Sequence, residues 1–184
     1  MTNLPPALAD RLSEYAHANR DRLASIIADL VRIPSENKPP RGSEDGCQQY
    51  VAGFLRRLGF DPVVFRPDEV PGAADHPFFW PGRDYKGRPN VCATRTGLGG
   101  GGRSLVLSGH IDTVPAGTQP WTKDPFGGQI EGGRLYGRGV VDMKGGIGIG
   151  LFALEAMSEL KIATRASLLF ETVVDEEFGG CNGT

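Results

Sequence analysis

The chain is most informative at residues 105–115, which read Leu105-Val106-Leu107-Ser108-Gly109-His110-Ile111-Asp112-Thr113-Val114-Pro115. A short apolar run that is followed by polar residues predicts a buried strand with His110 and Asp112 at its carboxyl end. Ligands of α/β proteins gather at the carboxyl ends of strands. The same pattern returns at residues 167–174, which are followed by Asp175-Glu176-Glu177. We therefore expect a functional site at one edge of a sheet.

The other apolar patterns predict helices that alternate with strands. Spacings of three and four residues predict one or two helices over 6–32 and further helices over 44–58 and 144–160. Strands are expected at 61–65, 90–96, 104–108 and 167–174, with a short hairpin over 127–136. This alternation indicates the α/β class, and no internal repeat or linker divides the chain.

Two stretches rich in glycine or proline interrupt the alternation. Residues 97–102 match the G-x-G-x-x-G pattern, but a dinucleotide site needs a helix after the glycines, and a strand is expected here. We interpret this stretch as a flexible hairpin turn. Residues 66–88 form a long excursion with His76 and the aromatic run 78–80. These side chains either line a substrate pocket or tuck the loop onto the core, and the sequence alone favours the second interpretation.

Composition restricts the partners and the compartment. The chain has 184 residues, of which 39% are hydrophobic, enough for a globular domain with a core. A net charge of -2 offers no basic surface for nucleic acid, and the apolar runs are too short to span a membrane. Without a visible secretory signal, and with three widely spaced cysteines, the chain is expected to be cytoplasmic. Cys181, near the acidic residues, is interpreted as a bystander thiol.

The polar residues at the strand ends suit a divalent metal. His110 offers a ring nitrogen, and Asp112, two residues further along an extended chain, projects to the same face and can orient the imidazole. Asp142 follows Val140-Val141, which we interpret as the end of a strand, and precedes a helix that starts at two glycines. It can be a ligand there or only a helix N-cap. Of Glu176 and Glu177, one can bind metal while the other transfers protons, and a solvated acidic turn is the alternative.

Four blocks of sequence, taken together, closely resemble the M20 metallopeptidase and deacylase family, most of all its acetylornithine deacetylase and succinyl-diaminopimelate desuccinylase branch. The blocks are residues 108–115, 121–126, 133–146 and 175–180, and the resemblance covers residues 10–184. It implies a three-layer α/β catalytic domain with a central mixed sheet. It also implies two divalent metal ions, zinc before cobalt or manganese.

The resemblance further implies a role for each polar residue. His110 would bind one metal, Asp142 would bridge the two, and Glu177 would bind the other. Asp112 would orient His110, and Glu176 would be the general base and acid. The peptide bond that follows Asp142 is expected to be cis.

The activity implied is hydrolysis of the amide bond of a small molecule, an N-acyl amino acid or peptide, of the deacetylase or desuccinylase type. A dipeptidase or carboxypeptidase of the same family is the alternative among enzymes, and a non-catalytic scaffold module is the alternative outside them. Family members continue with further metal ligands and with a lid and dimerisation domain. Residues 1–184 are therefore expected to be the N-terminal portion of the catalytic domain and inactive alone, in a full-length protein for which a homodimer is one possible state.

Overall fold

The computed structural model describes residues 5–180, 182 and 183, which contain a mixed four-stranded sheet in the order β3-β4-β8-β5. The strands are β3 (Val63–Phe65), β4 (Asn90–Arg95), β5 (Leu105–His110) and β8 (Leu168–Val173). β8 runs antiparallel to β4 and parallel to β5. The mixed sheet confirms the predicted α/β class. Two small antiparallel ribbons accompany it, β1 (Asn37–Lys38) with β2 (Arg41–Gly42) and β6 (Gln129–Glu131) with β7 (Arg134–Tyr136).

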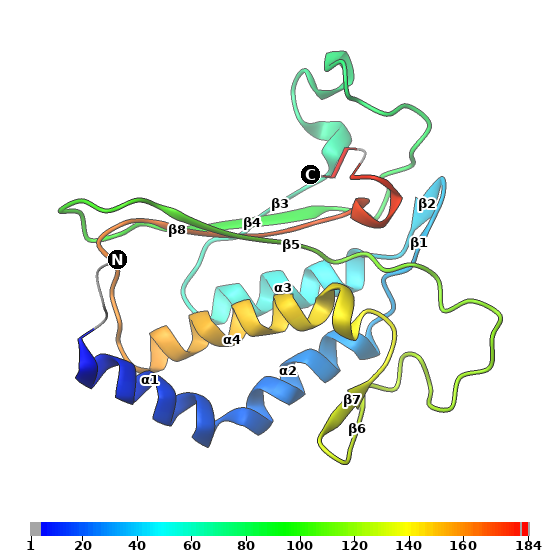
Figure 1. Ribbon diagram of the computed structural model, residues 1–184. Helices are drawn as coiled ribbons and strands as arrows, with labels where there is room; N and C mark the ends of the chain where they lie inside the picture. The colour runs from blue at the N-terminus through cyan, green and yellow to red at the C-terminus, as the bar shows by residue number, and fades with distance from the viewer. Residues whose placement is uncertain (1–4, 181, 184) are drawn as a thin grey trace.

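The α-helices of the described residues all lie on one side of the sheet (Figure 1). They are α1 (Pro6–Ala18), α2 (Arg20–Arg32), α3 (Asp45–Arg57) and α4 (Gly145–Glu159), close to the predicted ranges. Their apolar faces and the near face of the sheet form one core. No α-helix within residues 5–180 covers the opposite face, so the third layer stays a prediction. None of the described helices combines the length and the hydropathy needed to cross a membrane.

The predicted hairpin between β4 and β5 is wrong, because β8 lies between these two strands. The glycine-rich stretch 97–102 instead runs beside the chain that enters β8, where the N–H groups of Leu98 and Gly99 donate to the carbonyls of Thr164 and Arg165. At Gly97 an added side chain would collide with the main chain of Arg165. A local pattern gives no sign that a strand sixty residues later inserts here. The strand after the glycines is present as predicted, which removes the dinucleotide interpretation.

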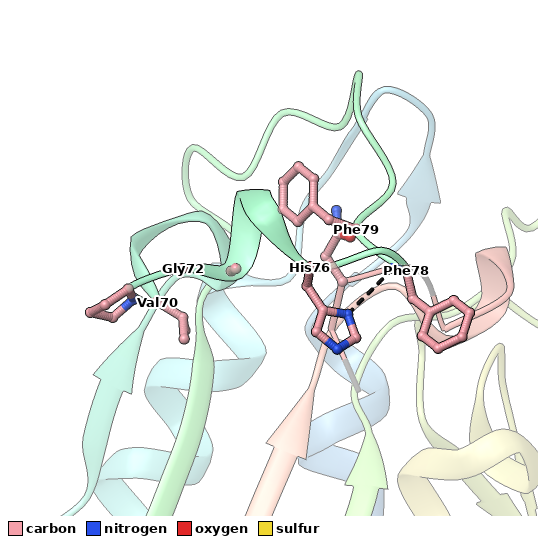
Figure 2. Close-up of a pocket in the computed structure, with 8 residues that line it drawn as sticks. Val70, Gly72, His76, Phe78 and Phe79 are labelled. Carbon is pink, nitrogen blue, oxygen red and sulfur yellow. Dashed lines mark hydrogen bonds between the residues drawn. The ribbon is translucent and has the colours of Figure 1, made fainter.

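The excursion 66–88 contains two short 3-10 turns, Pro67–Glu69 and Ala73–Asp75, and is otherwise irregular. His76, Phe78 and Phe79 line a cavity of about 450 Å³ (Figure 2). Phe78 is 83% exposed and Trp80 is 56% exposed, so the prediction that the aromatic run packs onto the core is wrong for these two rings. The alternative, a pocket for substrate, stays a prediction.

Two of the cysteines lie within the described residues. Cys47 is buried and Cys92 is half-buried, and both are free thiols whose pKa is raised by burial. Cys181, interpreted above as a bystander, lies outside the described residues.

Helices α2 and α4 pack closely because α4 has a glycine at the contact. A methyl group added at Gly148 would lie 2.5 Å from Cγ1 of Ile27 on α2. Gly53 in α3 differs, because the nearest atom to an added methyl group is 4.0 Å away, on the flexible side chain of Arg57. Gly148 therefore lies in a crowded helix contact, whereas Gly53 has room for a methyl group.

We expect Gly53→Ala to raise the free energy of unfolding by about 0.5–1 kcal/mol, because alanine loses less backbone entropy than glycine in a helix. Gly148→Ala should lower it by about 1–3 kcal/mol, because overpacking outweighs that gain. Urea unfolding of both variants measures the difference. An equal gain in both would contradict the close packing of α2 on α4.

Candidate metal centre

The site begins with the parallel pairing of β5 and β8. His110 ends β5 opposite Val173 of β8, and the N–H of Ile111 donates to the carbonyl of Val173 over 2.9 Å. Parallel strands present their carboxyl ends at the same edge of a sheet. The residues that follow β5 and the residues that follow β8 therefore leave the sheet side by side.

The imidazole of His110 is buried, and its surroundings fix its orientation. Nδ1 lies 3.0 Å from the main-chain carbonyl oxygen of Asp112, so Nδ1 carries the proton of the neutral ring and the lone pair belongs to Nε2. Nε2 lies 3.0 Å from Oδ1 of Asp142 and 3.5 Å from Oε2 of Glu176. Burial opposes protonation, but the hydrogen bonds to Asp112 and Asp142 outweigh it and raise the pKa of His110 to about 9.

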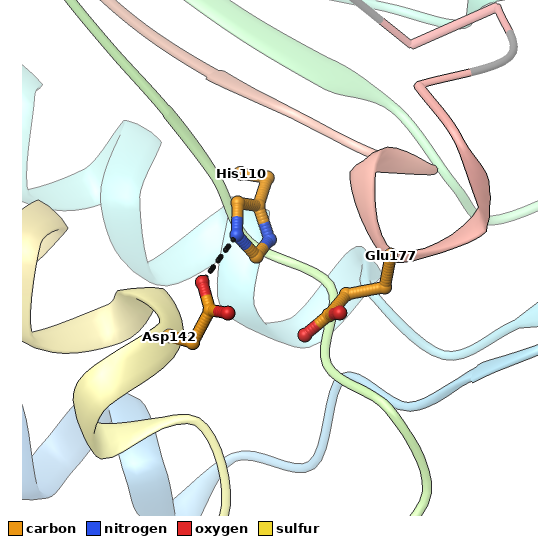
Figure 3. Close-up of side chains that lie close together, drawn as sticks. All are labelled: His110, Asp142 and Glu177. Carbon is orange, nitrogen blue, oxygen red and sulfur yellow. Dashed lines mark hydrogen bonds and ion pairs between the residues drawn. The ribbon is translucent and has the colours of Figure 1, made fainter.

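His110, Asp142 and Glu177 converge from three different elements (Figure 3). One ligand atom from each lies within 4.8 Å of the other two. Partial burial and the negative charge of Asp142 raise the pKa of Glu177, so a cation held here would favour the ionised form of Glu177. An imidazole nitrogen and two mutually repelling carboxylates are a donor set that fits a divalent cation such as zinc. These are the donors that the described residues bring together.

Asp142 lies in an irregular turn, Val140–Lys144, directly before α4. The prediction that a strand precedes Asp142 is therefore wrong. The peptide bond between Asp142 and Met143 is cis, as the resemblance implied. The N-cap of α4 is Lys144, and no side-chain hydrogen bond caps the helix, so the N-cap interpretation of Asp142 is also wrong. Instead, the Lys144 ammonium donates to two main-chain carbonyls at the C-terminal end of α2, which anchors the turn.

The carboxylate of Asp112 lies near His110 and also holds the acidic turn, which consists of residues 175–177. Its oxygens accept hydrogen bonds from the main-chain N–H groups of Glu176 and Glu177, at 3.2 and 3.1 Å, and from Nδ2 of Asn37 at 2.8 Å. The nearest carboxylate oxygen is 3.5 Å from Nδ1 of His110, further away than the main-chain oxygen of Asp112. Asp112 thus contacts the imidazole chiefly through its main chain and the glutamates through its side chain.

Asp175, the residue before the two glutamates, is the centre of a buried network. Its fully buried carboxylate accepts hydrogen bonds from Nε and Nη2 of Arg83, the hydroxyl of Tyr85, Nη2 of Arg88 and Nδ2 of Asn37. Burial opposes ionisation, but the donors Arg83, Tyr85 and Arg88 outweigh it and lower the pKa of Asp175 to about 2. Arg88 also forms a two-pronged ion pair with buried Glu44, at 2.9 and 2.7 Å. The buried arginines and their acidic partners therefore hold the acidic turn in place.

No feature of the sequence pattern led to five members of this network, Asn37, Glu44, Arg83, Tyr85 and Arg88. Adjacent carboxylates repel one another, so the acids that follow β8 need positive charge nearby. For Asp175 the source is the two arginines. The sequence does hold a signal, because Arg83 and Arg88 lie at the end of the irregular excursion, just before a buried strand, and arginines in that position suggest an acidic partner inside the protein.

Known proteins resemble this chain in sequence over most of its length. The family model described as peptidase family M20/M25/M40 matches residues 106–184. A succinyl-diaminopimelate desuccinylase of Methylobacterium radiotolerans is 37% identical over 91% of this chain and 38% of its own length. An N-formyl-4-amino-5-aminomethyl-2-methylpyrimidine deformylase of Halalkalibacterium halodurans is 30% identical over 94% of this chain and 37% of its own length. The chain thus spans little more than a third of the length of these curated relatives.

Solved structures share the fold. Human carnosine dipeptidase 1 matches with a TM-score of 0.69 and 22% identity over 92% of this chain and 35% of its own. The dipeptidase Dug1p of Saccharomyces cerevisiae matches with a TM-score of 0.69 and 19% identity over 94% of this chain and 36% of its own. At these identities the likeness concerns the fold alone. Residues 106–184 thus match peptidase family M20/M25/M40, and the curated relatives extend the sequence similarity over most of this chain.

Proposed function

We propose that this chain supplies part of the metal centre of a hydrolase that cleaves the amide bond of N-acyl amino acids or related small molecules. The observation that carries the proposal is the convergence of His110, Asp142 and Glu177, with the carboxylate of Glu176 beside them. The names of the relatives, a desuccinylase and a deformylase, support removal of an acyl group rather than cleavage within a peptide. The substrate is thus a small molecule with an acylated nitrogen.

Two divalent ions, zinc before cobalt or manganese, suit the three ligands. Asp142 would offer one oxygen to each ion, with His110 on the first and Glu177 on the second. When bound, the ions lower the pKa of water and stabilise the negative charge that develops on the carbonyl oxygen. Three protein ligands are too few for two tetrahedral shells. We therefore propose that residues 1–184 act as the N-terminal portion of a catalytic domain and that, alone, they bind metal weakly and turn over substrate poorly.

Glu176 is the proposed proton carrier. Its side chain is half exposed, and its Oε2 lies 3.5 Å from Nε2 of His110. Glu176 takes a proton from the water that adds to the amide carbon. When the C–N bond breaks, it delivers that proton to the leaving nitrogen. Asp112, which binds the main-chain N–H of Glu176, holds this carboxylate in position.

Replacement of His110 tests the metal centre. We expect His110→Ala to lower zinc affinity by more than about 100-fold, because even residues that only orient a ligand contribute 10–100-fold. Competition with a chromophoric chelator measures the affinity. His17→Ala is the matched control, because His17 is exposed on α1, where its ring bonds to Ser13 of the same helix. Equal zinc affinity in the two variants would sink the proposed site.

Replacement of Glu176 separates proton transfer from metal binding. In the full-length protein, Glu176→Gln should lower turnover of an N-succinyl amino acid by about 10²–10⁴-fold, the usual contribution of a general base. Its metal content should stay unchanged, because Glu176 is not a proposed ligand. Glu159→Gln, exposed at the end of α4 that is far from Asp142, is the control that should keep full activity.

The substrate class is decided in the same assay by a panel of N-succinyl, N-formyl and N-acetyl amino acids alongside unmodified dipeptides. Turnover confined to the dipeptides would overturn the proposed deacylation. Full activity of Glu176→Gln on every compound of the panel would overturn the role of Glu176.

A further inference from the structure

Asn37 connects the segment that follows β5 with the acidic turn that follows β8, and the proposed metal centre includes residues from both. It lies in the β1–β2 ribbon and is 5% exposed. Its main-chain N–H donates to the carbonyl of Thr113 at 2.8 Å, and the N–H of Thr113 donates to the carbonyl of Ser35 at 2.9 Å. These bonds tie the ribbon to the segment directly after Asp112. The main chain of Asn37 is thereby fixed relative to the end of β5.

The side-chain amide of Asn37 donates to two carboxylates and accepts from one arginine. Nδ2 donates to Oδ2 of Asp112 at 2.8 Å and to Oδ1 of Asp175 at 3.0 Å. Oδ1 accepts from Nη2 of Arg83 at 2.7 Å. Arginine only donates and ionised carboxylates only accept, so the chemistry of the neighbours determines which way the amide faces. Asn37 thus places two N–H bonds between two buried carboxylates.

The two carboxylates depend on this amide to different degrees. Within the described residues, Asp175 keeps Arg83, Tyr85 and Arg88 as donors when the amide is removed. Among the same residues, the Asp112 side chain has no arginine partner. Its remaining near donors are the main-chain N–H groups of Glu176 and Glu177, with Nδ1 of His110 further away at 3.5 Å. Loss of Asn37 therefore acts mainly on Asp112, and through Asp112 on the acidic turn.

From this connection we propose that Asn37 is a positioning residue, which sets the placement of Glu176 and Glu177 by holding Asp112 against Asp175. The inference rests on the proposed metal function, because its consequences are expressed through Glu177 as a ligand and Glu176 as a base. Its side-chain hydrogen bonds within the described residues go to Asp112, Asp175 and Arg83, none of which is a proposed metal ligand. Its effect is indirect and reaches the glutamates through their main-chain N–H groups.

Asn37→Asp is the sharpest variant, because it keeps the size of the side chain and replaces two donors with acceptors among buried carboxylates. Gln48→Ala is the matched control. Gln48 is an equally buried amide that bonds Thr172 of β8 and touches neither Asp112 nor Asp175. Both variants are measured in the purified protein for thermal midpoint, for cobalt affinity by chelator competition and for the visible spectrum of bound cobalt. In the active protein, kcat and KM are added.

We expect Asn37→Asp to lower cobalt affinity by about 10–100-fold, as loss of an orienting partner does, and to change the cobalt spectrum. It should lower kcat with a smaller change in KM, because Glu176 is displaced. Gln48→Ala should lower the thermal midpoint while its cobalt affinity and spectrum match the wild type. Asn37→Ser, which keeps one donor, should fall between wild type and Asn37→Asp, and it supplies the same readouts where Asn37→Asp does not fold.

Wild-type affinity and spectrum in the folded Asn37 variants would overturn the positioning role. Equal losses in Gln48→Ala and the Asn37 variants would also overturn it, because the effect would then belong to general stability. Failure of the wild-type protein to bind cobalt or zinc is a separate outcome. It would overturn the proposed metal function itself and, with it, the inference that rests on that function.

Discussion

The parallel pairing of β5 with β8 is the constraint on which the candidate site depends. It sets His110 opposite Val173, so that the segments after the two strands emerge at one edge of the sheet. The hydrogen bonds from the N–H groups of Glu176 and Glu177 to Asp112 then join these segments across that edge. Asp142 approaches from a third element, the turn before α4. A shift of one residue in this register would move the imidazole to the opposite face of the sheet.

Beneath the acidic turn lies a cluster of buried charges that explains the long irregular excursion. Arg83 and Arg88, which enter from the excursion, surround Asp175, and Arg88 also neutralises Glu44. Burying several charges costs free energy unless each finds partners, and here the hydrogen bonds supply them. Such a cluster adds more to a fixed geometry than to stability. The result is a rigid support for two glutamates that are themselves exposed or half-buried.

The sequence predicted those structural features that neighbouring residues determine and missed those that depend on residues far apart in the chain. The helices and β8 were predicted nearly to their ends, because their apolar spacing is a property of neighbouring residues. The β4–β5 hairpin was wrong because the insertion of β8 is decided at residues 168–173, far along the chain. His110, Asp142 and Glu177 were named through the family resemblance, and the fold brings them together. Asn37 was missed because it acquires its partners only when residues 112 and 175 meet.

The central claim is that His110, Asp142 and Glu177 bind metal together. Diffraction from crystals of the zinc-loaded protein, recorded on both sides of the zinc absorption edge, tests it most directly. The account predicts an anomalous peak about 2.0–2.1 Å from Nε2 of His110, with oxygens of Asp142 and Glu177 as the other near ligands of one ion or of a pair. Anomalous peaks confined to other parts of the protein, with Nε2 of His110 still bonded to Asp142, would contradict it.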